Sequence, residues 1–378
     1  MKNYSLVKKN KILHIITSLG DGGAEGVLYR LIKTTQKNYL HEIITLTDDR
    51  KHEYYLKKLG IKIIRIKLPR GKLRLKNLKF LYNTLKKKND YVIQTWLYHS
   101  DFLGGLFAKF SGNKKIIWNI RTSEIFISSI KLKTLLIIFF NAFLSWFIPK
   151  KIIICSANSI PRHLHVGFKN NFKVIHNGYD LSIYPKSKKK YKKKDFLLDA
   201  NDFVVGNVAR FNSVKNHLYL LDIFSKIYIR NRVPKLVLIG SGVDENNHTL
   251  KKKIKELKIE NRVMLLGRKD DVINIYPIFD LFILPSESEG FPNVLAESMM
   301  NKNIVFSTNV GEVSHIIPNK KFILPLNNHL KSAKKINYYF NNTKKDKLNK
   351  DKIINERVIK NCFSLSEMSK KYQDIWKF

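Results

Sequence analysis

The chain is poor in cysteine and offers no metal-binding spacing of cysteines. Its 378 residues include two cysteines, Cys155 and Cys362, which lie far apart in the sequence and have no neighbour at metal-ligand spacing. This usage is typical of a reducing compartment.

An apolar run long enough to cross a membrane is also lacking. The amino terminus holds only a short apolar run before Thr17 and Ser18, which predicts a first strand and not a signal peptide. The most apolar stretch, residues 135–149, is too short for a bilayer, which needs ~20 residues. Since it directly precedes an expected buried strand, we expect a core helix there. Its aromatic residues and flanking lysines leave open a helix lying in a membrane interface.

Acidic residues are scarce. The chain has 30 Asp and Glu residues and 70 Lys and Arg residues, which gives a formal net charge of +40. The densest run of lysines lies at 185–194. The simplest interpretation is a lysine-rich solvated surface. Attraction to an anionic membrane face or an anionic substrate is the functional alternative. Nucleic acid is disfavoured, because zinc-finger spacing, an RNA-binding aromatic signature and an obvious recognition helix are all missing.

Alternating strand and helix patterns fill most of the chain, whose 44% hydrophobic and 26% charged residues indicate a globular protein. The expected strands are residues 11–17, 41–47, 61–66, 91–96, 115–121, 151–155, 203–208, 235–239, 262–266, 280–284 and 303–307. Repeated βα units predict an α/β fold with two doubly wound, Rossmann-like domains, residues 1–180 and 181–365. Ligands should bind at the carboxyl ends of the strands, in the cleft between the domains.

Residues 280–300 combine a buried strand, a polar turn and a helix. The strand breaks at Pro285, and Pro292 suits the first turn of the helix that follows. Free amides at a helix start, together with the positive end of the helix dipole, form a binding site for phosphate. The amides concerned belong to Gly290, Phe291, Asn293 and Val294.

Two glutamates, Glu289 and Glu297, flank this phosphate-binding site. Bare carboxylates would repel a diphosphate, unless they accept hydrogen bonds from hydroxyl groups on either side of it. A nucleotide-sugar has that layout, with a sugar diol, a diphosphate and a ribose diol. The stretch therefore predicts a nucleotide-sugar site.

Other loops at strand ends carry cations and glycines. Arg210 and Lys215 follow the first strand of the second domain, where they would clamp a diphosphate and neutralise its charge as it leaves. In the first domain, Gly22 and Gly23 belong to a glycine-rich loop after the first strand, which lets the backbone approach a phosphate or sugar. The spacing is not that of a dinucleotide fingerprint, and a tight structural turn is the alternative.

The segments VARFNSVKNH (208–217) and ESEGFPNVLAESM (287–299) resemble the donor-site motifs of the retaining glycosyltransferases with the GT-B fold, glycosyltransferase family four or glycosyl transferases group 1. The GGAE loop, VIHNGYD (174–180) and LGRKDDV (266–272) resemble the same family, so the likeness covers nearly the whole chain. It implies two domains facing across a cleft, a last helix at about 366–376 that packs back on the first domain, and retention of anomeric configuration.

The resemblance also implies roles for individual residues. Arg210 and Lys215 would hold the diphosphate, Glu297 the ribose hydroxyls and Glu289 the donor sugar. Gly290, Phe291 and neighbouring amides would add phosphate contacts, while Gly22 and Gly23 approach from the other domain.

The first domain offers the remaining catalytic candidates. His99 and Arg121 follow strands at the cleft and are expected to touch substrate, although a structural role is the alternative for either. Asp101 and Glu124 are the options for a general base. The predicted catalytic set is therefore Glu289, Arg210, Lys215, His99 and Arg121.

We expect neither a cofactor nor a metal, because no Asp-x-Asp follows an apolar strand. Glu287-Ser-Glu289 is the segment most similar to an Asp-x-Asp motif. It leaves metal binding as an alternative, since its two side chains would point the same way on an extended segment.

These features predict a hexosyl- or N-acetylhexosaminyltransferase that moves sugar from a UDP-sugar to a hydroxyl of a glycan or lipid-linked acceptor. Its expected place is the inner face of a bacterial plasma membrane, in capsule or lipopolysaccharide synthesis, with an anionic membrane surface and no nucleic acid as partner. The alternatives are a nucleotide-sugar epimerase, a sugar-phosphate synthase, or a non-catalytic basic module that binds anionic lipid or nucleic acid.

Overall fold

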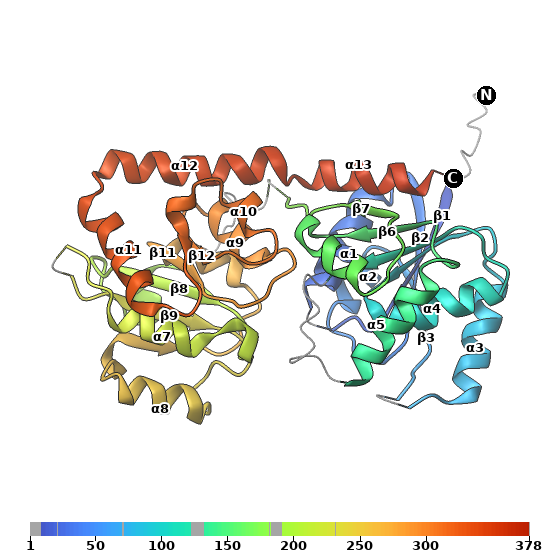
Figure 1. Ribbon diagram of the computed structural model, residues 1–378, viewed down its shortest axis with the longest axis horizontal. Coiled ribbons are helices and arrows are strands. Elements are labelled where there is room, and N and C mark those ends of the chain that lie inside the picture. The colour runs from blue at the N-terminus through green and yellow to red at the C-terminus, as the bar shows by residue number, and fades with distance from the viewer. Residues whose placement is uncertain are drawn as a thin grey trace. The chain divides into compact units, whose positions relative to one another are not determined.

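The computed structural model describes residues 9–20, 22–69, 72–121, 132–180, 182, 191–230 and 232–377. The chain divides into two compact units (Figure 1). Residues 1–178 and 365–378 form the N-terminal unit, and residues 179–364 form the C-terminal unit. The boundaries expected from the sequence were 1–180 and 181–365. Part of the lysine run, residues 185–190, lies outside the described residues.

The N-terminal unit is built on a seven-stranded sheet in the order β3-β2-β1-β4-β5-β6-β7, with every pair parallel. Its strands are β1 (Asn10–Ile16), β2 (Tyr39–Thr45), β3 (Lys62–Arg65), β4 (Val92–Trp96), β5 (Ile116–Ile120), β6 (Lys151–Ile154) and β7 (Phe172–Val174). The strand order reverses between β1 and β4. Loops that leave the carboxyl ends of these two strands therefore flank the natural ligand crevice of this sheet.

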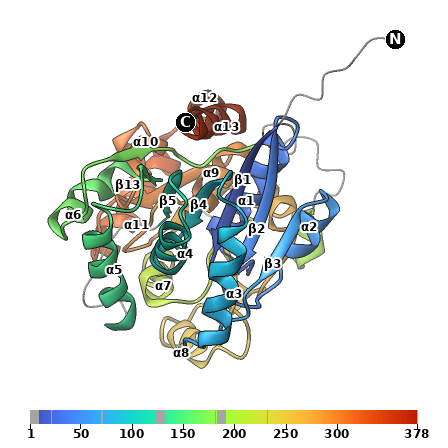
Figure 2. The same ribbon diagram turned by 90° about the vertical axis from the view of Figure 1, so that its right-hand side faces the viewer.

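Helices cover both faces of this sheet, because successive side chains of a strand point to opposite faces. Leu13 and Ile15 of β1 share a core with α3 (Leu75–Lys86), α4 (Tyr98–Phe110) and α5 (Leu132–Leu144). Ile12 and Ile16 share the other core with α1 (Gly23–Thr35), α2 (Glu53–Lys58) and α13 (Leu365–Trp376). Figure 2 shows α3, α4 and α5 side by side on their face. A short helix, α6 (Ile160–His165), precedes β7.

The last helix, α13, belongs to the N-terminal unit, where Tyr372 and Trp376 are buried. The Trp376 indole Nε1 donates a hydrogen bond of 2.6 Å to Gln94 of β4, and Asn119 of β5 donates one of 2.9 Å to the Tyr372 hydroxyl. Polar groups within two central strands thus fix the returning helix.

Helix α5 contains residues 135–144 of the apolar stretch 135–149, for which a core helix was expected. That expectation holds for one face only. Ile138 and Ala142 are buried in the core, whereas Phe139 and Phe143 are 48% and 65% exposed. The stretch contains two polar residues, Asn141 and Ser145, and both are buried, so hydrophobic periodicity alone does not tell which face is covered.

The C-terminal unit has a six-stranded parallel sheet in the order β10-β9-β8-β11-β12-β13. Its strands are β8 (Val204–Val208), β9 (Lys235–Ile239), β10 (Val263–Leu265), β11 (Leu281–Leu284), β12 (Ile304–Thr308) and β13 (Ile323–Leu324). The helices are α7 (His217–Ser225), α8 (His248–Glu256), α9 (Asn293–Met300), α10 (Val313–Ile316), α11 (His329–Asn342) and α12 (Lys345–Cys362). The prediction of an α/β fold with two parallel, Rossmann-like sheets is confirmed.

Two features of this unit were not predicted. The lysine-rich tract before the last helix forms α11 and α12. In α11, Ala333, Ile336 and Phe340 recur at helical spacing and are buried. Strand β13 consists of two residues, too few to give a periodic signal.

Candidate functional site

Two loops leave the sheet of the C-terminal unit at the point where its strand order reverses. Residues 209–216 follow β8 and residues 285–292 follow β11, and these two strands are neighbours. The Glu287 amide donates a 2.8 Å hydrogen bond to the Val214 carbonyl, and the Asn216 side chain donates one of 3.0 Å to the Glu287 carboxylate. We call this joined pair of loops the donor loops. They occupy the place where doubly wound sheets bind their ligands.

The donor loops bring Lys215 and Glu289 into an ion pair. The Lys215 Nζ lies 2.6 Å from Glu289 Oε1, and Ser286 Oγ donates a 2.7 Å hydrogen bond to the same oxygen. The Glu289 side chain is only 9% exposed, so this carboxylate is largely shielded from water. Glu287 and Glu289 have different partners, since Glu287 accepts a hydrogen bond from Asn216 and Glu289 pairs with Lys215.

Arg210 has a different environment from Lys215. It is exposed, and within the described part of the chain its guanidinium forms no ion pair or hydrogen bond. The backbone around it is fixed, because the Phe211 amide donates to the Ser241 carbonyl at 2.8 Å. A fixed backbone that carries an unpaired guanidinium provides a cation for an anionic ligand.

A glycine on a third loop fixes the turn at 289–290. Gly311 has a φ of +54°, and a Cβ there would lie 2.2 Å from the Glu289 carbonyl oxygen and 2.4 Å from that of Gly290. The next amide, of Glu312, donates a 3.1 Å hydrogen bond to the Gly290 carbonyl. Sequence reasoning missed Gly311, whose only signal was a glycine in the loop after an expected strand.

The start of α9 differs in detail from the prediction. Pro292 is the N-cap residue and does not lie in the first turn; its carbonyl accepts the Leu295 amide at 3.1 Å. The Phe291 ring is buried 5.1 Å from the ring of Phe363, and the Asn293 side chain accepts a 2.7 Å hydrogen bond from the Tyr179 hydroxyl. Both side chains thus anchor the turn. Any phosphate contact from these two residues would come from their backbone.

The remaining predicted positions of this region are Gly290, Val294 and Glu297, which are all partly exposed. Glu297 lies on α9, where its Oε2 accepts a 3.1 Å hydrogen bond from the Tyr276 hydroxyl. Glu289 lies in the turn before α9 and Glu297 lies about one turn into this helix, so the two carboxylates can serve different ends of one ligand. Tyr276 is a supporting residue that the sequence did not reveal.

In the N-terminal unit, the glycine loop leads directly into α1. Gly22 is the N-cap residue of the helix and Gly23 its first residue. A Cβ at Gly22 would lie 2.2 Å from the Glu25 carboxylate, so this position has no room for a side chain unless Glu25 moves. The tight helix entry by itself accounts for this glycine; Asp21 lies outside the described residues.

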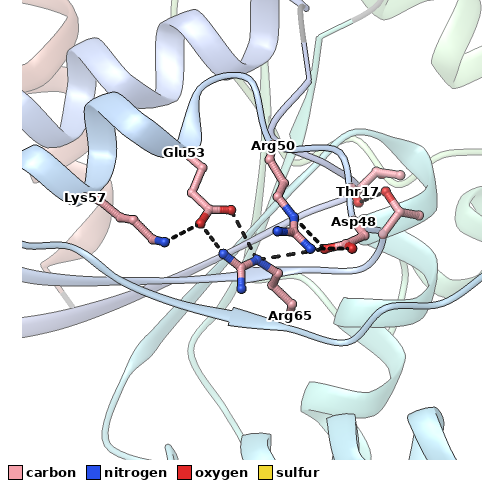
Figure 3. Close-up of polar contacts among 7 residues, drawn as sticks. Thr17, Asp48, Arg50, Glu53, Lys57 and Arg65 are labelled. Atoms are coloured by element: carbon pink, nitrogen blue, oxygen red, sulfur yellow. Dashed lines mark hydrogen bonds and ion pairs between the residues drawn. The ribbon is translucent and has the colours of Figure 1, made fainter.

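A network of charged side chains lies at the carboxyl ends of β2 and β3 (Figure 3). Arg50 binds Asp48 with two hydrogen bonds of 3.0 and 2.7 Å. Glu53 pairs with Arg65 and, at 2.7 Å, with Lys57. Each carboxylate therefore already holds a cation, and it would have to release that cation before it could act as a base.

The candidates after β4 and β5 differ in their access to a ligand. His99, in the first turn of α4, is partly exposed, and burial lowers its pKa, so its imidazole is neutral near pH 7. Arg121 is partly exposed, with its guanidinium 3.4 Å from the Tyr372 hydroxyl and over the Trp96 ring.

Asp101 is fully buried and accepts a hydrogen bond from Thr95, and burial raises the pKa of its carboxyl to about 7. In this conformation it holds the β4–α4 turn and does not face a ligand. Glu124 lies outside the described residues.

Comparisons with known proteins agree with this arrangement. Residues 21–183 match the family model described as Glycosyltransferase Family 4, and residues 188–357 match that of Glycosyl transferases group 1. The N-acetyl-alpha-D-glucosaminyl L-malate synthase of Bacillus anthracis is 28% identical over 44% of this chain and 43% of its own length. The UDP-Gal:alpha-D-GlcNAc-diphosphoundecaprenol alpha-1,3-galactosyltransferase of Escherichia coli is 27% identical over 67% of each chain.

A solved structure extends the likeness to nearly the whole fold. The crystal structure of Anabaena HepE in complex with UDP and glucose superposes with a TM-score of 0.82 at 20% identity, covering 97% of this chain and 98% of that one.

Proposed function

Because the chain is a glycosyltransferase of group 1 with a family 4-like N-terminal unit, we propose that it transfers a hexosyl or N-acetylhexosaminyl group from a UDP-sugar. The acceptor is a hydroxyl of a glycan or of a lipid-linked sugar, in the synthesis of a bacterial cell-surface glycan. The reaction retains the anomeric configuration and needs no metal. The observation that carries this proposal is the pair of donor loops at the switch point of the C-terminal sheet, with Lys215 beside Glu289.

Each part of the donor has a counterpart on the donor loops or on α9. Arg210 and Lys215 supply positive charge for the diphosphate, and the backbone amides near Gly290 and Val294 donate hydrogen bonds to it. Glu289 accepts hydrogen bonds from the sugar hydroxyls, and Glu297, held by Tyr276, accepts them from the ribose. As the sugar leaves, negative charge develops on the diphosphate, where fixed cations in a shielded site stabilise it most.

Two relatives support the choice of donor and acceptor. The Anabaena HepE structure holds UDP, and the Escherichia coli relative is named for a UDP-galactose donor and a lipid-linked diphosphate acceptor. An acceptor carried by a lipid would place the enzyme at the inner membrane face.

The test is a screen of UDP-sugars in which release of UDP is measured with and without membrane extract. We expect release that depends on the acceptor; release without any acceptor would instead indicate an epimerase or a hydrolytic side reaction. Arg210→Ala should weaken UDP binding about tenfold to a hundredfold, the usual range for a hydrogen bond to a charged group. The matched control is Arg357→Ala, which removes an exposed arginine of α12 and should leave UDP binding unchanged.

Three results would overturn parts of the proposal. Unchanged UDP binding by Arg210→Ala would favour a basic binding module without catalysis. An inverted product, detected by NMR of the new glycosidic bond, would contradict retention. Loss of transfer in EDTA, restored by a divalent cation, would contradict metal independence.

A further inference from the structure

Helix α5 and the turn after it expose a stripe of large apolar side chains. Each member is between 48% and 65% exposed: Leu136, Phe139, Phe140, Phe143, Trp146 and Phe147. The four members within α5 recur at spacings of three and four residues, so they lie along one face of the helix, and Trp146 and Phe147 follow in the turn. The opposite face, with Ile138 and Ala142, is buried in the core. We call the exposed side the α5 stripe.

The α5 stripe lies on the surface of the N-terminal unit. In Figures 1 and 2, α5 is next to α4, on the side away from α3. The Phe140 ring lies 5.9 Å from that of Phe102 on α4, and the rings of Phe143 and Phe147 are 5.4 Å apart. Single exposed apolar residues are ordinary on protein surfaces, but six along one stripe indicate a binding surface.

The sequence around the stripe has charge of one sign only. No Asp or Glu occurs between Glu124 and Asp180, whereas this interval holds seven Lys and Arg residues. Lys133 lies at the start of α5 and Lys150 shortly after the stripe, and both are exposed. The Lys169 backbone is tied to the end of the stripe, since its amide donates a 2.8 Å hydrogen bond to Ser145 Oγ.

We propose that the α5 stripe docks this enzyme on the surface of an anionic lipid bilayer. Aromatic rings suit the boundary between headgroups and acyl chains, and lysines beside them bind headgroup phosphates. The 13 residues of α5 rise only about 20 Å, less than the ~30 Å apolar thickness of a bilayer, so the helix lies in the plane of the interface. In the part of the chain that the structure describes, no helix is both long and apolar enough to cross a membrane.

A bilayer fits this surface better than a second copy of the chain does. Two α5 stripes brought together would also bring their flanking lysines together, with no acidic residue of that segment to neutralise them. Anionic headgroups neutralise these same lysines.

The inference deepens the membrane part of the proposed function, but its test does not need catalysis. Full-length protein would be sedimented with phosphatidylcholine vesicles that contain or lack phosphatidylglycerol. The triple variant Phe139→Gln/Phe143→Gln/Phe147→Gln should partition at least tenfold less onto the anionic vesicles. Trp146 is kept, because its Nε1 donates a hydrogen bond to the Gly167 carbonyl.

Matched controls separate the stripe from general effects. Tyr54→Gln/Tyr228→Gln/Tyr338→Gln removes three other aromatic residues that are 59–72% exposed, and it should bind vesicles like the parent protein. Lys133→Gln/Lys150→Gln should weaken binding to anionic vesicles but leave binding to neutral ones unchanged. UDP binding and the unfolding midpoint of every variant should equal those of the parent, which distinguishes this inference from the donor site.

Equal partition of the triple variant and the parent would overturn the proposal, as would equal parental affinity for both kinds of vesicle. A parent dimer in solution that the triple variant converts to a monomer would also overturn it, since the stripe would then be a contact between copies.

Discussion

Lys215 and Glu289, which are 74 positions apart in the chain, form an ion pair with 2.6 Å between Nζ and Oε1. Their proposed ligands differ, since Lys215 serves the diphosphate and Glu289 serves the sugar hydroxyls. Binding of donor must therefore rearrange the pair or extend it, and the diphosphate competes with Glu289 for the ammonium group. Glu289 would thus set the affinity for the leaving nucleotide as well as for the sugar.

Substitutions at the two positions should differ in their effect on UDP binding. Glu289→Gln removes the competing carboxylate, so we expect UDP to bind as tightly or several-fold more tightly while sugar transfer falls. Lys215→Met keeps the length of the side chain without its charge and should weaken UDP binding about tenfold or more. Isothermal titration with UDP and an assay of sugar transfer would measure the two effects.

The matched control for Glu289→Gln is Glu287→Gln, because Glu287 binds the Asn216 side chain and no cation that the structure records. It should leave the affinity for UDP unchanged. If Glu289→Gln weakened UDP binding as much as Lys215→Met does, competition within the ion pair would be wrong.

Gly311→Ala should disrupt the donor loops, although Gly311 itself lies on a third loop. The new methyl group would overlap the carbonyl oxygens of Glu289 and Gly290, and the φ of +54° is unfavourable for alanine. We expect UDP affinity to fall at least tenfold, with a loss of stability of about 1–3 kcal/mol. Gly60→Ala is the control, since its φ is +72° but no atom lies within 4 Å of the added Cβ. Equal effects of the two variants on UDP binding would show that backbone strain alone matters.

The sequence predicts those parts of the site that lie within one short segment. The strand, turn and helix at 280–300 follow from local patterns, as does the position of Arg210 after a strand. The contact between Lys215 and Glu289 joins two segments through the sheet, and Gly311 reaches the same turn from a third. Such contacts depend on strand order, which no local pattern contains.

Composition was misleading in two helices. The lysines of α11 hide a regular apolar spacing of Ala333, Ile336 and Phe340, so no helix was predicted in that tract. Helix α5 carries large apolar residues on both its buried and its exposed face, and its covered face was decided by packing on α4. In both cases the buried face depends on tertiary contacts.

Trp376→Phe should destabilise the N-terminal unit through Gln94. The buried side-chain oxygen Oε1 of Gln94 would lose the 2.6 Å hydrogen bond from the indole Nε1, and an unsatisfied buried acceptor costs about 1–3 kcal/mol. Denaturant unfolding of the full chain would measure the loss. Trp146→Phe removes a similar hydrogen bond at a residue that is 55% exposed, so its effect should be much smaller. If Trp146→Phe lowered the free energy of unfolding as much as Trp376→Phe does, burial would not explain the cost of losing the hydrogen bond.

Asp101→Asn should change how stability depends on pH. Burial raises the pKa of Asp101 from 3.8 to about 7, so between these values the carboxyl is protonated in the folded state and ionised in the unfolded one. Unfolding then releases a proton and becomes easier as the pH rises, by up to about 1.4 kcal/mol per pH unit. The stabilisation present below pH 4 is thus lost progressively up to about pH 7. Asparagine resembles the protonated acid and does not titrate.

We therefore expect the difference in unfolding free energy, variant minus parent, to rise from pH 5 to pH 7 and then to level off. Urea unfolding at one-unit steps of pH would measure it, and the comparison cancels the titration of every other group that both proteins share. Asp90→Asn is the control, because Asp90 is 57% exposed beside Lys11 and should give a curve that does not rise in this range. Parallel curves for Asp101→Asn and the parent would mean that the Asp101 carboxyl is ionised in the folded protein, and its burial against Thr95 would then need a cation or solvent nearby.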